Sequence, residues 1–177
     1  MLNLMARLQA LRVQVAARIV ASGLGSGALI VASLAIGIAA VPLIATQHSW
    51  IAAMALLGGL FCAAVGRTGS DVRWRDLSAA FDLIVLAGVP FGFALADPSR
   101  ALAASFVLFG IVAAVAASLF ADVTRKLNAA DCGICILAFL LACAMPPWFS
   151  LIAYVMGLAA FIAAGTRVSL ALARSDG

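Results

Sequence analysis

The chain has 177 residues, of which 66% are apolar and only 10% are charged. Soluble domains carry roughly a quarter charged residues, so this composition excludes an ordinary water-soluble domain. The net charge of +4 does not indicate nucleic-acid binding, because the basic residues form no stripe with interleaved aromatic side chains.

The first element predicted in chain order is an amphipathic helix over residues 1–22. Its apolar residues recur at steps of three or four: Leu4, Leu8, Leu11, Val15 and Ile19. Because Arg7 and Arg18 fall on another face, the pattern predicts a helix that lies in the headgroup region of a membrane. A simple cytoplasmic extension of the first span is the alternative. The following apolar stretch is too long for a signal peptide, so this segment is expected to be retained.

Three long stretches that contain no charged residue dominate the rest of the chain, at 19–66, 101–121 and 132–166. A helix needs about 20 apolar residues to cross a membrane. We therefore predict an all-α bundle of six transmembrane helices. The spans are expected near 25–45, 50–65, 77–96, 101–121, 127–145 and 148–166. Small residues such as Gly59, Gly88 and Gly92 mark expected close contacts between them.

The distribution of basic residues predicts how this bundle is oriented. If the N-terminus is cytoplasmic, the outer turns hold only Arg100, and every other basic residue falls on the inner side. Basic residues concentrate in cytoplasmic loops, so we expect an N-in/C-in, multi-pass topology. An odd number of spans would spoil this partition.

Asp82 is the most informative single residue, because it lies more than one turn inside the third span. An ionised carboxylate at membrane depth costs on the order of 2.5 to 3.5 kcal/mol, and such residues usually face the bundle interior. Asp82 is either part of a ligand, metal or proton site, or a carboxyl group that is protonated or paired with an arginine. Arg75 lies seven residues earlier on the same helix face and is a candidate partner.

A second group of polar residues is expected at the inner membrane surface. Asp131 enters the fifth span from the same side as Asp82. Together with Arg67, Arg125 and Lys126 it could line a polar pocket, although a solvated helix end is the simpler interpretation.

Cys132 and Cys135 form a C-x-x-C pair, a spacing found in redox and metal sites. A structural zinc site needs four ligands. The sequence has no second pair of this kind, and its single histidine, His48, is expected at the opposite membrane face. Packing by small side chains is therefore the favoured interpretation.

Three segments carry a resemblance to a known family: DLIVLAGVPFGFALADP (82–98), CAMPPWF (143–149) and GTRV (165–168). Together with six spans and an N-terminal amphipathic helix, they resemble a bacterial branch of the CDP-alcohol phosphotransferases (CDP-alcohol phosphatidyltransferases), membrane enzymes of phospholipid biosynthesis. The resemblance implies a bacterial inner membrane, CDP-diacylglycerol as the lipid substrate, magnesium or manganese as the cofactor, and a homodimer.

The family's metal-binding motif is D-x-x-D-G-x-x-A-R, followed by G-x-x-x-D-x-x-x-D. Arg67 matches the arginine and Asp82 matches the last aspartate, whereas the other three aspartates fall on Gly59, Cys62 and Ser78. Divalent ions need several oxygen ligands, so we expect the family's fold with its transfer activity largely lost. Asp82 would be what remains of the catalytic metal site. The residues expected to bind lipid or headgroup phosphate are Arg67, Arg125, Lys126 and Asp131.

Two other functions stay open at this point. The chain could be a structural membrane subunit or assembly factor without catalysis, held by a membrane-protein partner. It could also be a small transporter, for which the sequence offers only isolated acids at membrane depth.

Overall fold

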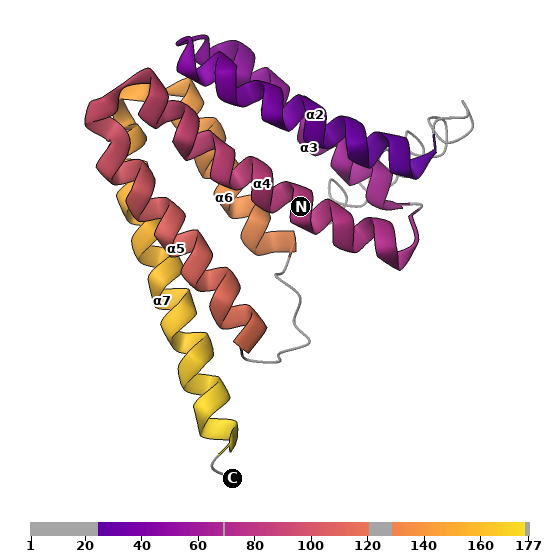
Figure 1. Cartoon of the computed structure of the whole chain (residues 1–177), viewed down its shortest axis with the longest axis vertical. Helices are drawn as coiled ribbons and strands as arrows, with labels where there is room; N and C mark the ends of the chain where they lie inside the picture. The colour runs from indigo at the N-terminus through magenta and orange to yellow at the C-terminus, as the bar shows by residue number, and fades with distance from the viewer. Residues whose placement is uncertain (1–24, 69, 121–128, 176–177) are drawn as a thin grey trace, which may run out of the picture.

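A computed structural model describes residues 25–68, 70–120 and 129–175, and every element in these ranges is helical (Figure 1). The predicted amphipathic helix at 1–22 lies outside the described residues. The α-helices are α2 (Ser26–Ala45), α3 (Ser49–Thr68), α4 (Val72–Ala96), α5 (Ala101–Phe120), α6 (Ala129–Ala144) and α7 (Phe149–Ser175). The short 3-10 helices η1 (Pro98–Arg100) and η2 (Pro146–Trp148) join α4 to α5 and α6 to α7. The all-α prediction is confirmed for this part of the chain.

Five of the helices are long and apolar enough to cross a membrane. The sixth, α6, has only 16 residues. A helix of this length extends about 24 Å, somewhat less than the roughly 30 Å of hydrocarbon in a bilayer. The fifth span was predicted to begin at residue 127, but residues 121–128 are not described. A sixth span therefore stays a prediction.

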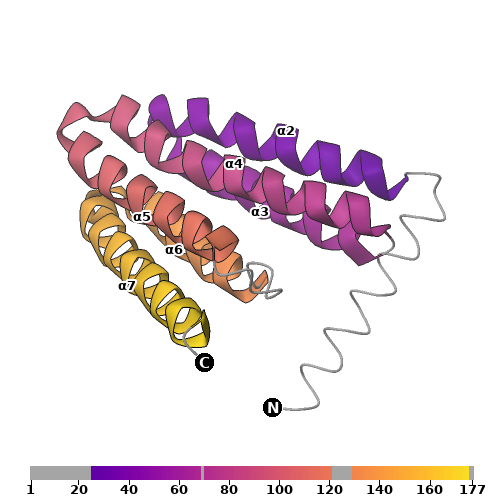
Figure 2. The same cartoon turned by 60° about the horizontal axis from the view of Figure 1, so that its bottom comes forward.

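The helices run alternately up and down, so their connections gather at two ends. The turns at 46–48, 97–100 and 145–148 come together at one end, which we call the turn end (Figure 1). From the turn end, the axes of α2, α3 and α4 extend to one side and those of α5 and α7 to another (Figures 1 and 2). Helix α6 contacts members of both groups. We call the opposite end, where the two groups diverge, the splayed end.

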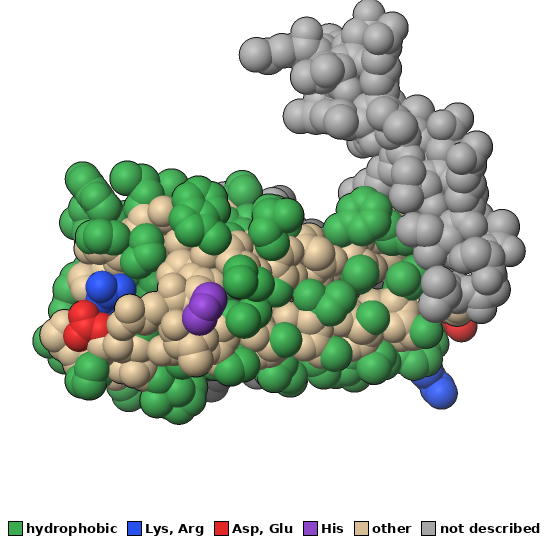
Figure 3. All heavy atoms as spheres, turned by 90° about the horizontal axis from the view of Figure 1, so that it is seen from above, with side chains coloured by type: hydrophobic (Ala, Val, Ile, Leu, Met, Phe, Trp, Pro, Cys, Tyr) green, Lys and Arg blue, Asp and Glu red, His purple; other side chains and the backbone are tan. Residues whose placement is uncertain are grey.

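The main hydrophobic core draws buried side chains from all the described α-helices. Near the turn end, the rings of Phe93 and Phe149 stack with their centroids 4.1 Å apart, and both side chains are almost fully buried. The outer surface is apolar too. Leu102 and Phe109 are exposed on α5, and Leu137 is exposed on α6. Seen from above, hydrophobic side chains dominate the visible face between charged groups near its two ends (Figure 3), as expected of a surface that faces lipid.

Glycines set the closest approaches between helices. A Cβ atom added to Gly110 of α5 would lie 2.8 Å from the carbonyl oxygen of Gly157 on α7. A Cβ atom added to Gly59 of α3 would lie 3.1 Å from the carbonyl oxygen of Ser33 on α2. A Cβ atom added to Gly92 of α4 would lie 3.0 Å from the carbonyl oxygen of Val41, also on α2. Where two helix backbones are in direct contact there is no room for a side chain, so these contacts depend on glycine.

Two helices extend beyond the spans predicted from the sequence. Helix α4 begins at Val72 rather than near residue 77, and α7 continues to Ser175 rather than ending near residue 166. Charged residues mark where the apolar part of a span ends, but arginine, leucine and alanine are good helix formers. The backbone therefore continues as a helix past that level.

Candidate functional site

Arg67, in the last turn of α3, joins that helix to α4 at the splayed end. Its Nε donates a hydrogen bond to Ser78 Oγ at 2.7 Å, and its Nη2 donates to Asp82 Oδ2 to form an ion pair. Ser78 and Asp82 are four residues apart and share one face of α4. We call these three residues the arginine clamp.

The clamp is enclosed but not sealed. Ser78 is fully buried, the Asp82 side chain is 14% exposed and the Arg67 side chain is 29% exposed. The position of Arg67 at the C-terminus of α3 is itself favourable, because the helix dipole stabilises a cation there. The arginine thus neutralises the acid inside the bundle and still presents part of its guanidinium to the surroundings.

Close packing of α2 brings the clamp helices together. A Cβ atom added to Gly66, the residue before Arg67, would lie 3.2 Å from the carbonyl oxygen of Ser26. The indole ring of Trp74 on α4 lies against Gly27, where an added Cβ would be 2.7 Å from the ring. The first turn of α2 is therefore fixed against both helices that carry the clamp.

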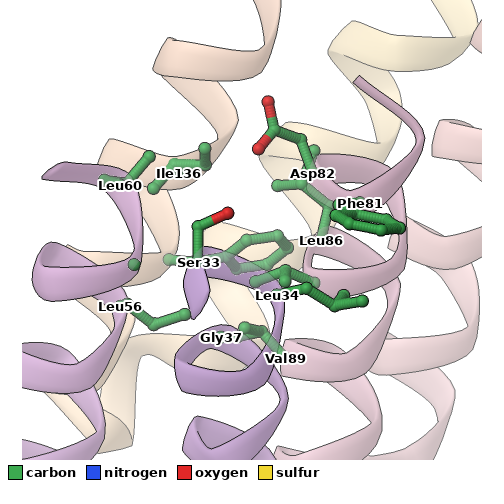
Figure 4. A pocket seen from close by; sticks show the side chains of 13 residues that line it. Ser33, Leu34, Gly37, Leu56, Leu60, Phe81, Asp82, Leu86, Val89 and Ile136 are labelled. Carbon is green, nitrogen blue, oxygen red and sulfur yellow. The ribbon is translucent and has the colours of Figure 1, made fainter. Parts of the chain in front are cut away.

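A small cavity of about 30 Å³ lies beside Asp82, between α2, α3, α4 and α6 (Figure 4). Its walls are mostly apolar, including Leu56, Phe81 and Ile136, and its polar side chains are Asp82 and Ser33. The Ser33 hydroxyl donates to the Ile30 carbonyl oxygen at 2.6 Å. A cavity of this volume has room for at least one water molecule but not for a lipid headgroup.

The residues around Asp82 do not fit a divalent metal ion. Magnesium and manganese sites need about six oxygen ligands, including several that are anionic. Here the Asp82 carboxylate is already bound to a guanidinium, and Ser78 accepts a hydrogen bond from the same group. Within the described residues, no three histidine, cysteine or acidic side chains gather into a group that could hold a metal. A dication beside Asp82 would also be repelled by Arg67.

The other predicted site residues are placed only in part. Asp131 belongs to the first turn of α6, but its side chain is not among those described. Arg125 and Lys126 lie outside the described residues, as do the side chains of Cys132 and of Arg75. The polar pocket predicted from Asp131, Arg125 and Lys126 therefore stays a prediction.

Asp82 has a partner on a neighbouring helix, which the spacing within its own helix did not indicate. The structure pairs Asp82 with Arg67, fifteen residues earlier along the chain. A contact with Arg75, the candidate partner from the sequence, stays a prediction because that side chain is not described. This pairing supports the interpretation of Asp82 as an arginine-paired carboxyl group. Ser78 was noted in the sequence only as a lost motif aspartate, although its spacing of four residues from Asp82 is a signal that both face the same way.

A second arginine contact, not predicted from the sequence, joins the other group of helices. Arg167 on α7 donates through Nη1 to Ser118 Oγ at 2.7 Å and to the Ala114 carbonyl oxygen at 3.3 Å, both on α5. Each of the two helix groups is thus joined by an arginine–serine contact in its splayed half.

Comparison of the chain with protein-family models, with curated proteins and with solved structures gives no match. The resemblance to the CDP-alcohol phosphotransferases accordingly rests on the sequence segments and on the motif positions alone.

Proposed function

We propose that the chain is a multi-pass protein of a bacterial inner membrane, with six spans and an N-in/C-in topology. In this proposal it resembles the CDP-alcohol phosphatidyltransferases in architecture and binds an anionic lipid headgroup at Arg67. It does not transfer a phosphatidyl group from CDP-diacylglycerol to an alcohol.

The placement of basic residues supports this orientation. Along the described helices they cluster toward the splayed end, with a single exception, Arg100, at the turn end. The residues on the splayed side are Arg67, Arg73, Arg75, Arg167 and Arg174. If the splayed end faces the cytoplasm, the positive-inside rule is satisfied.

The observation that carries the functional proposal is the arginine clamp. Ser78 and Asp82 match the third and fourth aspartates of the metal-binding motif that the sequence resembles. In this chain Arg67 bonds to both positions. A fixed guanidinium thus supplies positive charge where the family would hold metal ions, and a guanidinium cannot activate an attacking alcohol as a metal ion does.

Headgroup binding follows from the donors that Arg67 retains. A guanidinium has five N–H groups, and the bonds to Ser78 and Asp82 use one on Nε and one on Nη2. The other N–H groups suit a phosphate, which arginine binds with good geometry. Because Asp82 shares the guanidinium, we expect binding of moderate strength.

The test measures lipid binding to the purified full chain by native mass spectrometry, with CDP-diacylglycerol and phosphatidylglycerol as the probes. One lost charge-assisted hydrogen bond is worth about 1.5 to 3 kcal/mol, so Arg67→Gln should weaken binding at least about tenfold. The matched control is Arg73→Gln, which removes an exposed arginine of α4. Equal binding by the two variants would contradict the proposal. The double variant Arg67→Met, Asp82→Leu checks that any loss does not reflect misfolding.

A structural subunit without a ligand is the second candidate function. The cavity beside Asp82 is too small for a headgroup, and the clamp already has a structural role because it joins α3 to α4. Copurification with one fixed membrane partner, together with lipid binding that does not depend on Arg67, would favour this alternative.

A further inference from the structure

A larger pocket, of about 310 Å³, opens at the turn end, far along the helices from the clamp. It lies where the α2–α3 turn, the end of α4 and the two 3-10 helices meet. Its polar side chains are Gln47, Ser49, Asp97 and Arg100, and Ile44 and Phe93 provide a buried apolar floor. Pockets for small molecules measure roughly 300 to 1,000 Å³, so this one suits a ligand about the size of a lipid headgroup.

The pocket presents one anion and one cation in a fixed arrangement. Arg100 Nε donates to Asp97 Oδ2 at 3.1 Å, while Asp97 Oδ1 accepts from the Ser99 amide at 3.0 Å and from the Ser99 hydroxyl at 2.7 Å. These bonds from Ser99, with a smaller effect from Arg100, lower the pKa of Asp97, so the carboxylate is ionised at neutral pH. The Arg100 guanidinium has further N–H groups besides the Nε–H that donates to Asp97, and these can donate to a ligand.

Gln47 brings a polar side chain to the pocket from the turn that ends α2. The φ angle of Gln47 is 63°, in the left-handed region that favours glycine. Among the described residues, no other non-glycine residue has a positive φ. A glycine would adopt this conformation readily. The Gln47 and His48 amides donate to the carbonyl oxygens of Ile44 and Leu43 at 2.9 and 2.8 Å, the bonding pattern of a common helix C-cap. The Gln47 side chain lines the pocket.

Two tryptophans place the pocket at the level of lipid headgroups. Trp50, at the start of α3, is 71% exposed, and Trp148, in η2, is 54% exposed. Exposed indoles next to apolar helices are typical of the membrane–water interface. The pocket between these helix ends therefore opens where headgroups lie, provided that the bundle spans the membrane as proposed above.

We propose that the turn-end pocket binds the zwitterionic headgroup of an aminophospholipid. Arg100 and Gln47 donate hydrogen bonds to the phosphate, and Asp97 binds the ammonium group. The charges are complementary, because the arginine meets the lipid phosphate and the aspartate meets the lipid ammonium group. An anionic phospholipid without an amine would give the Asp97 carboxylate no ammonium group to bind, so the site discriminates against it.

The experiment uses the purified full chain with Arg67→Gln, which removes the anionic-lipid site proposed above. This protein is titrated with short-chain phosphatidylethanolamine, with phosphatidylglycerol, and with soluble phosphoethanolamine. Phosphatidylethanolamine should bind at least about tenfold more tightly than phosphatidylglycerol, and Asp97→Asn should reduce that preference about tenfold, as expected for one lost charge-assisted hydrogen bond. Equal binding of the two lipids, or a preference that survives in Asp97→Asn, would overturn the proposal. If soluble phosphoethanolamine binds as tightly as the lipid, the claim that the pocket's ligand is a lipid is overturned.

A second variant keeps the test independent of folding. Gln47→Gly should raise the melting temperature, because it relieves the strained backbone, and should weaken binding of phosphatidylethanolamine. A stabilised variant with unchanged binding would contradict a role for Gln47 in this site. His48→Gln is the matched control, since His48 is exposed in the same turn and does not line the pocket. Because Arg67→Gln is the background of these titrations, failure here is distinguishable from failure of the Arg67 site.

Discussion

Arg67→Met is expected to lower the free energy of unfolding by about 3 kcal/mol, because it leaves Asp82 inside the bundle without its cation. Asp82 is only 14% exposed, and Ser78, which also loses its partner, is fully buried. The 29% exposure of Arg67 places the expected loss at the lower end of the range for broken buried pairs. Reversible unfolding in detergent micelles measures the change.

The double variant Arg67→Met, Asp82→Leu separates the ion pair from the side chains that form it. Replacing both partners of a buried pair by apolar residues is often neutral or stabilising. We therefore expect the double variant to recover most of the stability that Arg67→Met loses. If the two substitutions instead add, the residues are not coupled and the clamp does not exist as described.

Gly110→Leu is expected to destabilise the bundle by about 3 kcal/mol, since overpacking of this kind forces neighbouring elements apart. The nearest atoms to an added Cβ are the carbonyl oxygen and the Cα of Gly157, at 2.8 and 3.0 Å. These are backbone atoms, so no rotation of a side chain can make room. Helices α5 and α7 would have to separate along their contact.

Gly165→Leu is the matched control for this prediction. Gly165 also lies on α7, but an added Cβ there meets nothing within 4 Å. Its replacement should change the free energy of unfolding by no more than about 0.5 kcal/mol. Similar losses for Gly110→Leu and Gly165→Leu would show that the α5–α7 contact is not the one described.

The helices could be predicted from the sequence because the membrane selects one simple signal, the length of an uncharged run. The ends of the helices could not be predicted in this way. The charged residues around Arg73 and Asp76 precede the predicted third span, yet α4 already begins at Val72. Charge predicts the depth at which a residue lies, whereas helix propensity and neighbouring contacts decide where the backbone stops being helical.

The site was predicted in part. Asp82 stood out because an acid inside a span needs a partner, and Arg67 stood out because it matches a motif. Their pairing was missed because they lie on different helices and sequence spacing compares residues only within one helix. The α5–α7 contact was missed for the same reason: Gly110 and Gly157 are isolated glycines that meet only in three dimensions.

The turn-end pocket shows the same limit more clearly. Gln47 and Arg100 come from separate turns, and neither residue belongs to a motif. A glutamine in a turn is unremarkable in sequence, and its positive φ is visible only in the folded backbone.

The central claim, that Arg67 has taken the place of the metal ions and that phosphatidyl transfer is lost, is tested most directly by CMP release. The purified chain is incubated with CDP-diacylglycerol, magnesium or manganese, and a mixture of alcohols, with an active CDP-alcohol phosphatidyltransferase assayed in parallel. We predict that CMP release by the chain equals that by Asp82→Asn and stays at background. Metal-dependent CMP release that Asp82→Asn abolishes would contradict the account.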